Sequence, residues 1–451
     1  MYLKIAFGNI RRALSDYSVY FLTLMLAACL LYAFTSSMDY LLALDLTDRQ
    51  RDLCASSANI TEAFSIFMVI VFAFLVLYAN RFILRRRSRE FALYGILGMG
   101  GARVSLILLL EGAIVGVIAL VCGIALGILA SPLFGVVAAF VFNAPWSLVF
   151  EVFPQAIMWT SGCFCALMLF ATLLGMRAMR KKSLLELLSE DRTPQKSVKA
   201  SRIPRALQPI VGFALNLVVW YACLFNLPLF LGFIVPLGVA ATFGTGLIFR
   251  YFAARIPERR ARRRPDWYWR GLNSFVTRQI EWKVGASSTA MACTCVLVAV
   301  SICMMASGLA FSVGMRLGSN EILIDALSPI GYIGIFYGLT FLVTAAAVLA
   351  LQQLSEGVES IERYKTLAKL GTSEKMLKGA VRKQAAVYFA APFVGALVHC
   401  IFGLALIAFL ALSLGSGQFP LIVGGTIGVT FVLMLAYYAL TCRQCARMLV
   451  K

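Results

Sequence analysis

The chain has 451 residues, of which 61% are hydrophobic and 14% are charged, and its formal net charge is +20. Soluble domains usually carry about 25% charged residues, so this composition excludes an ordinary soluble fold and predicts a membrane protein. The basic excess by itself is also compatible with nucleic-acid binding, and only its distribution along the chain separates the two interpretations.

Apolar runs of about 20 residues, the length that crosses a bilayer as an α-helix, recur ten times along the chain. They are too long for the strands of a membrane barrel, so we expect an all-α polytopic fold. Only Asn226 and Leu227 lie between the fifth and sixth runs, which predicts a tight hairpin or a re-entrant pair. The expected spans are residues 18–37, 63–80, 104–130, 156–176, 207–225, 228–249, 288–311, 331–351, 386–411 and 421–440.

Lysine and arginine are distributed unevenly between the two sides of these spans. If the N-terminus is cytoplasmic, 38 of the 41 basic residues fall in cytoplasmic segments, and only Arg49, Arg51 and Arg316 fall outside. Cytoplasmic loops of membrane proteins are enriched in basic residues, so we expect both termini in the cytoplasm. The charge is thereby assigned to topology and to anionic lipid, and no nucleic-acid partner is expected.

Two segments share one pattern. Residues 90–98 and 363–371 each have an aromatic residue at the second position and end in Leu-Gly. At the same offset of 273 residues, Glu111 corresponds to Gln384. Such matched spacing indicates an internal repeat of two four-span halves. The expected parts are a first half over residues 1–176, a cytoplasmic linker with a central span pair over residues 177–253, and a second half over residues 254–451.

The two repeated segments are expected to form short cytoplasmic helices. Ile361, Tyr364 and Leu367 recur at i, i+3 and i+6 and so form an apolar stripe, which can fill a groove on a partner protein. The alternative is a helix that lies on the membrane surface. Gly98 and Gly371 are expected to end these helices in the left-handed conformation that glycine adopts most easily.

Four groups of motifs carry a family resemblance. They are Ala6-Phe7-Gly8-Asn9-Ile10-Arg11-Arg12 with Asp16-Tyr17-Ser18; Arg89-Glu90-Phe91-Ala92-Leu93-Tyr94; Leu354-Ser355-Glu356 with Glu362-Arg363-Tyr364 and Leu370-Gly371-Thr372; and Ser183-Leu184-Leu185-Glu186-Leu187-Leu188. In these motifs the chain resembles the FtsX-like permease family, and within it the ten-span permeases of the bacitracin-export type. The resemblance covers nearly the whole chain and is most specific in the third group.

The resemblance implies the permease subunit of an ATP-driven ABC transporter in the bacterial cytoplasmic membrane, with antimicrobial peptide resistance or export as the role of the subgroup. It implies two ABC ATPase subunits as partners, one for each coupling helix, besides membrane lipids and a candidate sensor histidine kinase. The residues implied in ATPase coupling are Glu90, Phe91, Tyr94, Leu97 and Gly98 in the first helix, and Ile361, Tyr364, Leu367, Leu370 and Gly371 in the second.

One feature departs from the subgroup's pattern. Its members usually carry a large extracellular domain between spans seven and eight, whereas only residues 312–329 fill that place here. That domain is thought to engage the peptide antibiotic or a sensor partner. The resemblance therefore extends to the permease scaffold and not to that domain.

No G-x-x-x-x-G-K-[ST] motif occurs in the sequence, so a P-loop for ATP is absent. We therefore expect a chain that is not itself an enzyme and needs no cofactor. Two other function classes stay open, namely a secondary transporter, which also uses internal repeats, and a sensor or scaffold that regulates a histidine kinase.

Three polar residues fall in or beside the expected spans. Glu111 lies roughly two turns inside the third span, where it can face the bundle interior, pair with a cytoplasmic-side arginine or be protonated. Its counterpart Gln384 cannot ionise, so we favour a polar packing role over proton transport. His399 is the only histidine. A hydrogen-bonded core residue is favoured there over a proton relay, and no metal site is expected.

Cysteines and aromatic residues complete the set of candidates. Most of the twelve cysteines lie in spans, where they act as small apolar residues. Cys442 and Cys445 form a lone C-x-x-C, which is too little for a zinc site. Residues 267–269 (Trp-Tyr-Trp) follow five arginines between 259 and 264, and we interpret this segment as an inner-leaflet anchor and not as a nucleic-acid stacking surface.

Overall fold

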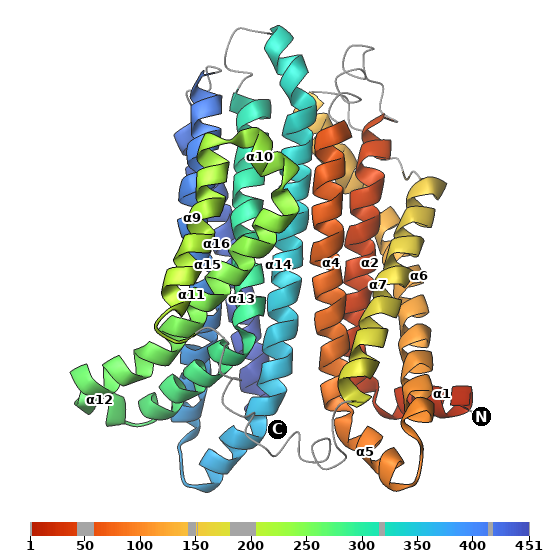
Figure 1. The fold of residues 1–451 in the computed structure, drawn as a ribbon, viewed down its shortest axis with the longest axis vertical. Helices are drawn as coiled ribbons and strands as arrows, with labels where there is room; N and C mark the ends of the chain where they lie inside the picture. Colours follow the sequence, from red (N-terminus) through yellow and green to blue (C-terminus); the bar gives the residue numbers. More distant parts are fainter. Residues whose placement is uncertain are drawn as a thin grey trace. The chain divides into compact units, whose positions relative to one another are not determined.

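The computed structural model describes residues 2–42, 58–142, 150, 152–180, 204–314, 321–413 and 418–450. Within these ranges the regular structure is helical and contains no strand, which confirms the all-α prediction. The chain divides into two compact units, residues 1–195 and 196–451, which are described separately (Figure 1).

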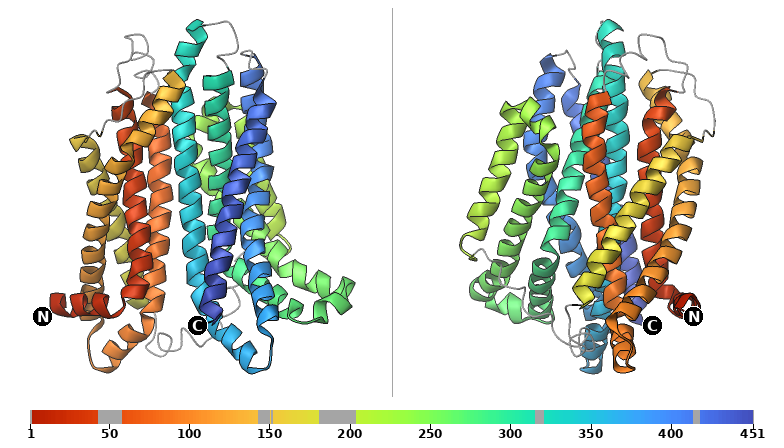
Figure 2. Two further views of the ribbon diagram at one scale, coloured as in Figure 1. Left: turned by 180° about the vertical axis from the view of Figure 1, so that it is seen from behind. Right: turned by 45° about the vertical axis from the view of Figure 1, so that its right-hand side comes forward.

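Unit 1 is built around one long helix. α2 packs against α4, α6 and α7, while α1 lies against α6 and runs across the ends of the long helices (Figure 2). Leu3 and Phe7 of α1 are exposed and Ala6 is buried, as expected for a helix that rests on a membrane surface. The helices of unit 1 are α1 (Tyr2–Arg12), α2 (Leu14–Leu42), α4 (Ala58–Arg86), α5 (Ser88–Ile96), α6 (Gly101–Phe142) and α7 (Pro154–Arg180).

Small residues let α2 and α6 approach closely. A Cβ atom on Gly123 would lie 2.6 Å from the Ala28 Cβ, and one on Gly127 would lie 2.6 Å from the Tyr32 ring. In lipid, van der Waals packing between small residues is a main source of helix association, because the lipid tails are as apolar as the side chains. Gly123 and Gly127 therefore set the distance between these two helices.

Unit 2 is organised around α13, which packs against α11, α14 and α15. Close contact with α14 again depends on glycine, since a Cβ atom on Gly334 would lie 2.8 Å from the Gly308 Cα. The helices of unit 2 are α9 (Gln208–Phe225), α10 (Leu227–Gly232), α11 (Ile234–Arg263), α12 (Pro265–Trp269), α13 (Asn273–Leu309), η1 (Ala310–Gly314, a π-helix), α14 (Glu321–Lys369), α15 (Glu374–Ser413) and α16 (Phe419–Val450).

Each of the ten expected spans is helical, and the sixth, residues 228–249, is divided between α10 and α11. Among the described residues, nine helices are long and apolar enough to cross a membrane. The remaining expected span, residues 63–80, falls on α4, which has 29 residues and contains a shorter apolar stretch, Met68–Leu84. The chain is thus a multi-pass membrane protein.

The connection between the fifth and sixth expected spans is longer than the sequence suggested. α9 ends at Phe225, and a separate six-residue helix, α10, precedes α11. The Asn226 side chain accepts a hydrogen bond from the Leu229 N–H at 3.1 Å, and Pro228 lies in the first turn. An N-cap followed by proline starts a new helix, which the apolar run by itself did not reveal.

The second repeated segment is not a separate short helix. It is the end of α14, which continues without a break through 49 residues, whereas the first segment forms a distinct helix, α5, after a turn at Arg87. The motif at residues 183–188, which carries part of the family resemblance, lies outside the described residues, as do Arg49, Arg51 and Arg316.

Candidate functional site

The two repeated segments end in the same capped turn. Gly98 and Gly371 have φ angles of 84° and 89°, which confirms their predicted left-handed conformation. In the turn that ends the first repeated segment, the Gly98 N–H donates to the Gly95 carbonyl and the Met99 N–H donates to the Tyr94 carbonyl. This pair of bonds defines a Schellman motif. The same two bonds recur at Gly371 and Thr372, which donate to Ala368 and Leu367. We call the two turns corner 1 and corner 2.

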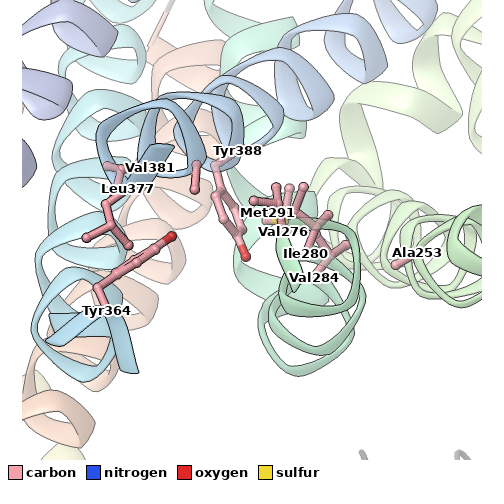
Figure 3. Packing of buried hydrophobic residues seen from close by; sticks show 10 residues of the cluster. Ala253, Val276, Ile280, Val284, Met291, Tyr364, Leu377, Val381 and Tyr388 are labelled. Atoms are coloured by element: carbon pink, nitrogen blue, oxygen red, sulfur yellow. The ribbon is translucent and has the colours of Figure 1, made fainter. Parts of the chain in front are cut away.

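An aromatic side chain holds each corner to its own unit. Phe91 of α5 is 2% exposed and packs with Leu84 and Leu108. Tyr364 of α14 is also 2% exposed, and it lies in a larger cluster that joins α11, α13, α14 and α15 (Figure 3). Phe91 and Tyr364 occupy the same position of the repeated sequence pattern, so the shared aromatic residue is a core anchor.

This burial corrects the expected apolar stripe. Tyr364 faces the protein interior and therefore does not present its ring to a partner, and Leu367 is partly buried against the same cluster. The side chain of Ile361 lies outside the described residues. The exposed apolar side chains are instead those next to the glycines, since Leu97 is 79% exposed and Leu370 is 76% exposed. At corner 1, Leu93 and Ile96 are exposed as well.

A buried ionic cluster lies beneath corner 1. Arg87, at the turn between α4 and α5, is 1% exposed and forms an ion pair with Glu111 of α6, which is also 1% exposed. The Arg87 guanidinium also donates to the hydroxyl of Tyr17 at 2.5 Å and to Glu90 at 2.9 Å. The Tyr17 hydroxyl donates in turn to Glu111 at 2.7 Å. Glu111 therefore pairs with an arginine, which is one of the three arrangements expected from sequence.

The N-terminal helix completes this cluster. The side-chain amide of Asn9 donates to the second Glu111 oxygen at 2.8 Å and lies 3.2 Å from the Tyr94 hydroxyl. Asn9 belongs to α1, Tyr94 to α5 and Glu111 to α6. The cluster thus connects five helices, because Tyr17 adds α2 and Arg87 adds the end of α4.

The charges in the cluster stabilise one protonation state. Burial raises the pKa of Tyr17, and the nearby Glu111 carboxylate raises it further, so the hydroxyl remains protonated. Burial alone would lower the pKa of Arg87, but the facing oxygens of Tyr17, Glu111 and Glu90 outweigh it and the pKa is raised. Arg87 is therefore a permanent cation, and it has a carboxylate close enough to neutralise it.

A neutral cluster occupies the corresponding place beneath corner 2. The Tyr364 hydroxyl donates to the Gln384 side-chain oxygen at 2.8 Å and lies 3.4 Å from that of Gln279. All three side chains are buried. Gln279 lies 85 residues before Tyr364, and Asn9 lies 85 residues before Tyr94. Each corner therefore brings together an amide from a helix earlier in the chain, a tyrosine from the corner segment, and Glu111 or Gln384 from the helix that follows.

Sequence reasoning identified Glu111 and Gln384 but missed Arg87 and Tyr17 as members of the site. Arg87 stands in a run of basic residues, 85–89, which was assigned to topology as a group. The sequence signal for an arginine partner is Glu111 itself, because an acidic residue inside a span favours a cation nearby. This signal does not say which arginine is the partner. The sequence contains five arginines between 81 and 89, and only the fold selects one.

His399 is hydrogen-bonded and partly buried, which agrees with the favoured hydrogen-bonded role but places it at the edge of the core. Its Nδ1 accepts from the Trp220 indole N–H at 3.1 Å, and its Nε2 lies 2.9 Å from the Thr245 hydroxyl. Because Nδ1 accepts, the neutral ring carries its proton on Nε2 and donates to Thr245. His399 therefore joins α9, α11 and α15 through hydrogen bonds at both of its nitrogens.

No group of three or more histidine, cysteine or acidic side chains able to hold a metal ion occurs within the described ranges. The cysteines there are free thiols, and Cys223, Cys295 and Cys400 are buried. The predicted coupling residue Glu90 is half-exposed and bonded to Arg87. The described part of the site is thus a set of structural contacts, with two exposed apolar corners.

Part of the chain that contains corner 1 matches a known protein family. Residues 62–184 match the family model "FtsX-like permease C-terminal". That range contains corner 1 with α5, α6 and α7.

Several proteins of Bacillus subtilis (strain 168) are similar to the chain. "Bacitracin export permease protein BceB" is 25% identical over 47% of this chain and 32% of its own length. "ABC transporter permease protein YxdM" is 37% identical over 21% of this chain and 15% of its own length. "Uncharacterized ABC transporter permease YvcS" is 24% identical over 42% of this chain and 29% of its own length. The chain thus spans about a third or less of the length of these relatives. Residues 62–184 are similar to FtsX-like permeases, and over the matched residues the chain is similar to bacterial ABC transporter permeases.

Proposed function

We propose that this chain is the permease subunit of an ABC transporter and that a separate ATPase docks on corners 1 and 2. In this proposal the chain lies in a bacterial cytoplasmic membrane, with both termini and both corners on the cytoplasmic side. The division into residues 1–176, 177–253 and 254–451 describes its two halves and the central pair. Antimicrobial peptide export or resistance is the proposed role, because one relative is named a bacitracin export permease.

One observation carries this proposal. Leu97 and Leu370 are 79% and 76% exposed at the same position of two identical capped turns. Both lie outside the apolar spans of the helices to which they are joined. Contiguous exposed apolar side chains, such as Leu97 with Leu93 and Ile96, mark surfaces that bind a partner. Two equivalent corners favour two equivalent partner subunits, so we propose two ATPases for each permease chain.

The clusters beneath the corners supply a route for transmitting movement. A docked ATPase that displaces corner 1 also moves Arg87, and Arg87 is bonded to α2 and α6 through Tyr17 and Glu111. Corner 2 is bonded to α13 and α15 through Tyr364. Because packed interfaces respond as discrete rearrangements, the membrane helices are expected to shift together with the corner. This chain thus contributes no ATP chemistry of its own in the proposal.

The docking surface can be tested by replacing the two corner leucines. In Leu97→Ser with Leu370→Ser, two large exposed apolar side chains are lost while the buried anchors stay intact. Burial of one such side chain is worth roughly 1.5–3 kcal/mol. We therefore expect at least a tenfold loss of ATPase recovered with the purified permease, and about half of the wild-type amount with either single variant.

A matched control uses Leu421, which is 75% exposed at the start of α16 and hence at the opposite end of the spans of unit 2. Leu421→Ser should leave ATPase recovery unchanged. Full ATPase stoichiometry in the double variant, with normal expression, would show that the corners are not the docking surface.

Orientation is tested by labelling introduced cysteines with a membrane-impermeant reagent. Arg262→Cys and Lys369→Cys, both at exposed positions, should react only after the membrane is permeabilised. Labelling of either position in intact cells would contradict the cytoplasmic placement.

The polar contacts favour the permease over a secondary transporter. Ion-coupled transporters place ionisable groups near the membrane midplane. Glu111 is paired with Arg87, Gln384 is neutral, and His399 is hydrogen-bonded on both sides. These contacts support structural roles. A histidine kinase partner stays a proposal that rests on the resemblance alone.

A further inference from the structure

The strongest charged surface of unit 2 lies where α11 leaves its span. Between residues 255 and 270 the chain carries seven arginines and only two acidic residues, Glu258 and Asp266. We call this segment the basic arm. The end of α11 and α12 project sideways from the other helices of unit 2 (Figures 1 and 2). The exposed arginines of the basic arm are Arg255, Arg259, Arg260, Arg262, Arg263, Arg264 and Arg270.

The arm also exposes aromatic side chains beside these charges. Trp269 is 72% exposed and Trp267 is 40% exposed. The Arg260 guanidinium lies over the Trp267 ring, 5.3 Å from its centroid. Between the two tryptophans, Tyr268 is 3% exposed and fixes α12 to the unit. The short helix therefore turns its one buried ring inward and its two tryptophans outward.

The arm is held firmly in this position. The Asn273 side-chain amide donates to the Trp267 carbonyl at 2.9 Å, and its oxygen accepts from Lys383 of α15 at 2.8 Å. Gly271 has a φ of 62° and leaves room for Met376, whose terminal carbon lies 3.2 Å from the place of a Cβ there. The arm is thus a built surface attached to α13 and to the first turns of α15.

We propose that the basic arm binds the phosphate headgroups of anionic phospholipids in the membrane that this chain spans. Guanidinium groups match phosphate oxygens in charge and in geometry, and tryptophan favours the region between headgroups and acyl chains. Phe252 of α11 is exposed just before the arm and Ile256 is exposed at its start, so an apolar surface leads directly into the charged one. A lipid bilayer can bind both surfaces at once, because its headgroups contact the arginines and its acyl chains contact the apolar side chains.

The alternative occupant is an acidic surface of a partner protein. Seven arginines suit such a partner equally well by charge alone. The two exposed tryptophans and the continuity with the lipid-facing side of α11 favour the bilayer. The inference does not need the ATPase docking proposed above, and it needs only that the chain spans a membrane.

Quenching of tryptophan fluorescence by brominated lipids tests this proposal. The purified full chain is placed in nanodiscs of phosphatidylcholine that contain an increasing fraction of brominated phosphatidylglycerol or, separately, brominated phosphatidylcholine. We expect the anionic lipid to quench at a lower mole fraction, with at least a threefold preference. The variant Trp267→Phe with Trp269→Phe identifies the part of the signal that comes from the arm.

Two charge variants decide the outcome. Replacing Arg259, Arg260, Arg262 and Arg263 by glutamine should abolish the preference, and replacing the same four by lysine should retain at least half of it. The control Arg11→Gln with Arg12→Gln, on α1 of unit 1, should leave the arm's signal unchanged. Equal quenching by the two lipids in the wild type, or a preference that survives the glutamine variant, overturns the proposal. If the wild type shows no lipid preference, and a protein that co-purifies with the wild type is lost from the glutamine variant, then the arm is a protein-binding surface instead.

Discussion

The two corners share a backbone and an aromatic anchor but differ in charge. Beneath corner 1, a buried arginine faces a buried glutamate, and beneath corner 2 a tyrosine lies between two glutamines. The offset of 273 residues that relates Glu111 to Gln384 relates Arg87 to Ser360, so both partners of the ion pair are neutral in the second half. Either charge of the pair alone would be buried without compensation, so the absence of both from the second half is consistent with a neutral cluster there.

The comparison teaches that the geometry of a corner does not require charge. The capped turn and the buried aromatic residue are common to both corners. Together they are sufficient to hold the leucine in its exposed position. The ionic cluster adds charged contacts, since Arg87 bonds to Tyr17, Glu90 and Glu111, whereas the Tyr364 hydroxyl lies near two neutral amides, Gln279 and Gln384. We expect corner 1 to be the more sensitive of the two to substitution.

The largest effect is expected when one charge of the pair is removed. Arg87→Gln leaves Glu111 buried without a cation, and breaking a buried pair in this way costs about 3–5 kcal/mol. The purified variant should unfold at a clearly lower temperature in detergent, measured by intrinsic fluorescence. Glu111→Gln should cost less, because Arg87 keeps its contact with the half-exposed Glu90.

The double variant sharpens the comparison by making corner 1 as neutral as corner 2. Arg87→Gln with Glu111→Gln removes both charges, so it should be more stable than Arg87→Gln alone. If the double variant loses as much stability as the sum of the two single variants, the two side chains are not coupled and the ion pair is not what distinguishes the corners.

A smaller effect, equal at both corners, is expected from the capping glycines. Gly98→Ala and Gly371→Ala each place a side chain at positive φ, which costs about 1–2 kcal/mol. A Cβ at either position meets no atom within 4 Å, so the cost is conformational only. Asparagine tolerates this conformation better than alanine, and the Asn variants should therefore melt between wild type and Ala. Unequal losses at the two corners would break the backbone equivalence.

The smallest effect is expected at the neutral cluster. Tyr364→Phe keeps the buried ring and removes one hydroxyl, so the expected loss of stability is about 0.5–1.5 kcal/mol. Gln384→Leu should have a similar effect, since Tyr364 loses its closer acceptor. The same melting assay compares these variants with Arg87→Gln. A loss at Tyr364 as large as that at Arg87 would contradict the conclusion that charge makes corner 1 more sensitive.

The sequence by itself determined the class of protein, the number of apolar runs, the repeat and the two left-handed glycines. These features depend on local properties: the length of an apolar run must match the bilayer, and a helix end with Leu-Gly favours one capped turn. The apolar runs and the capped turns could therefore be predicted from neighbouring residues alone, whereas the repeat appears only when segments 273 residues apart are compared. The hydrogen bonds of His399 are those of a packed polar residue, as the sequence favoured, although the side chain is only partly buried.

The tertiary structure decided which side of each corner segment faces the protein. Ile361, Tyr364 and Leu367 form a stripe by spacing, but spacing cannot distinguish a surface that meets a partner from one that meets the chain's own α13 and α15. It also selected Arg87 among five neighbouring arginines as the partner of Glu111, 24 residues away. Both outcomes depend on which distant helices pack together, and that information is absent from any local window of the sequence.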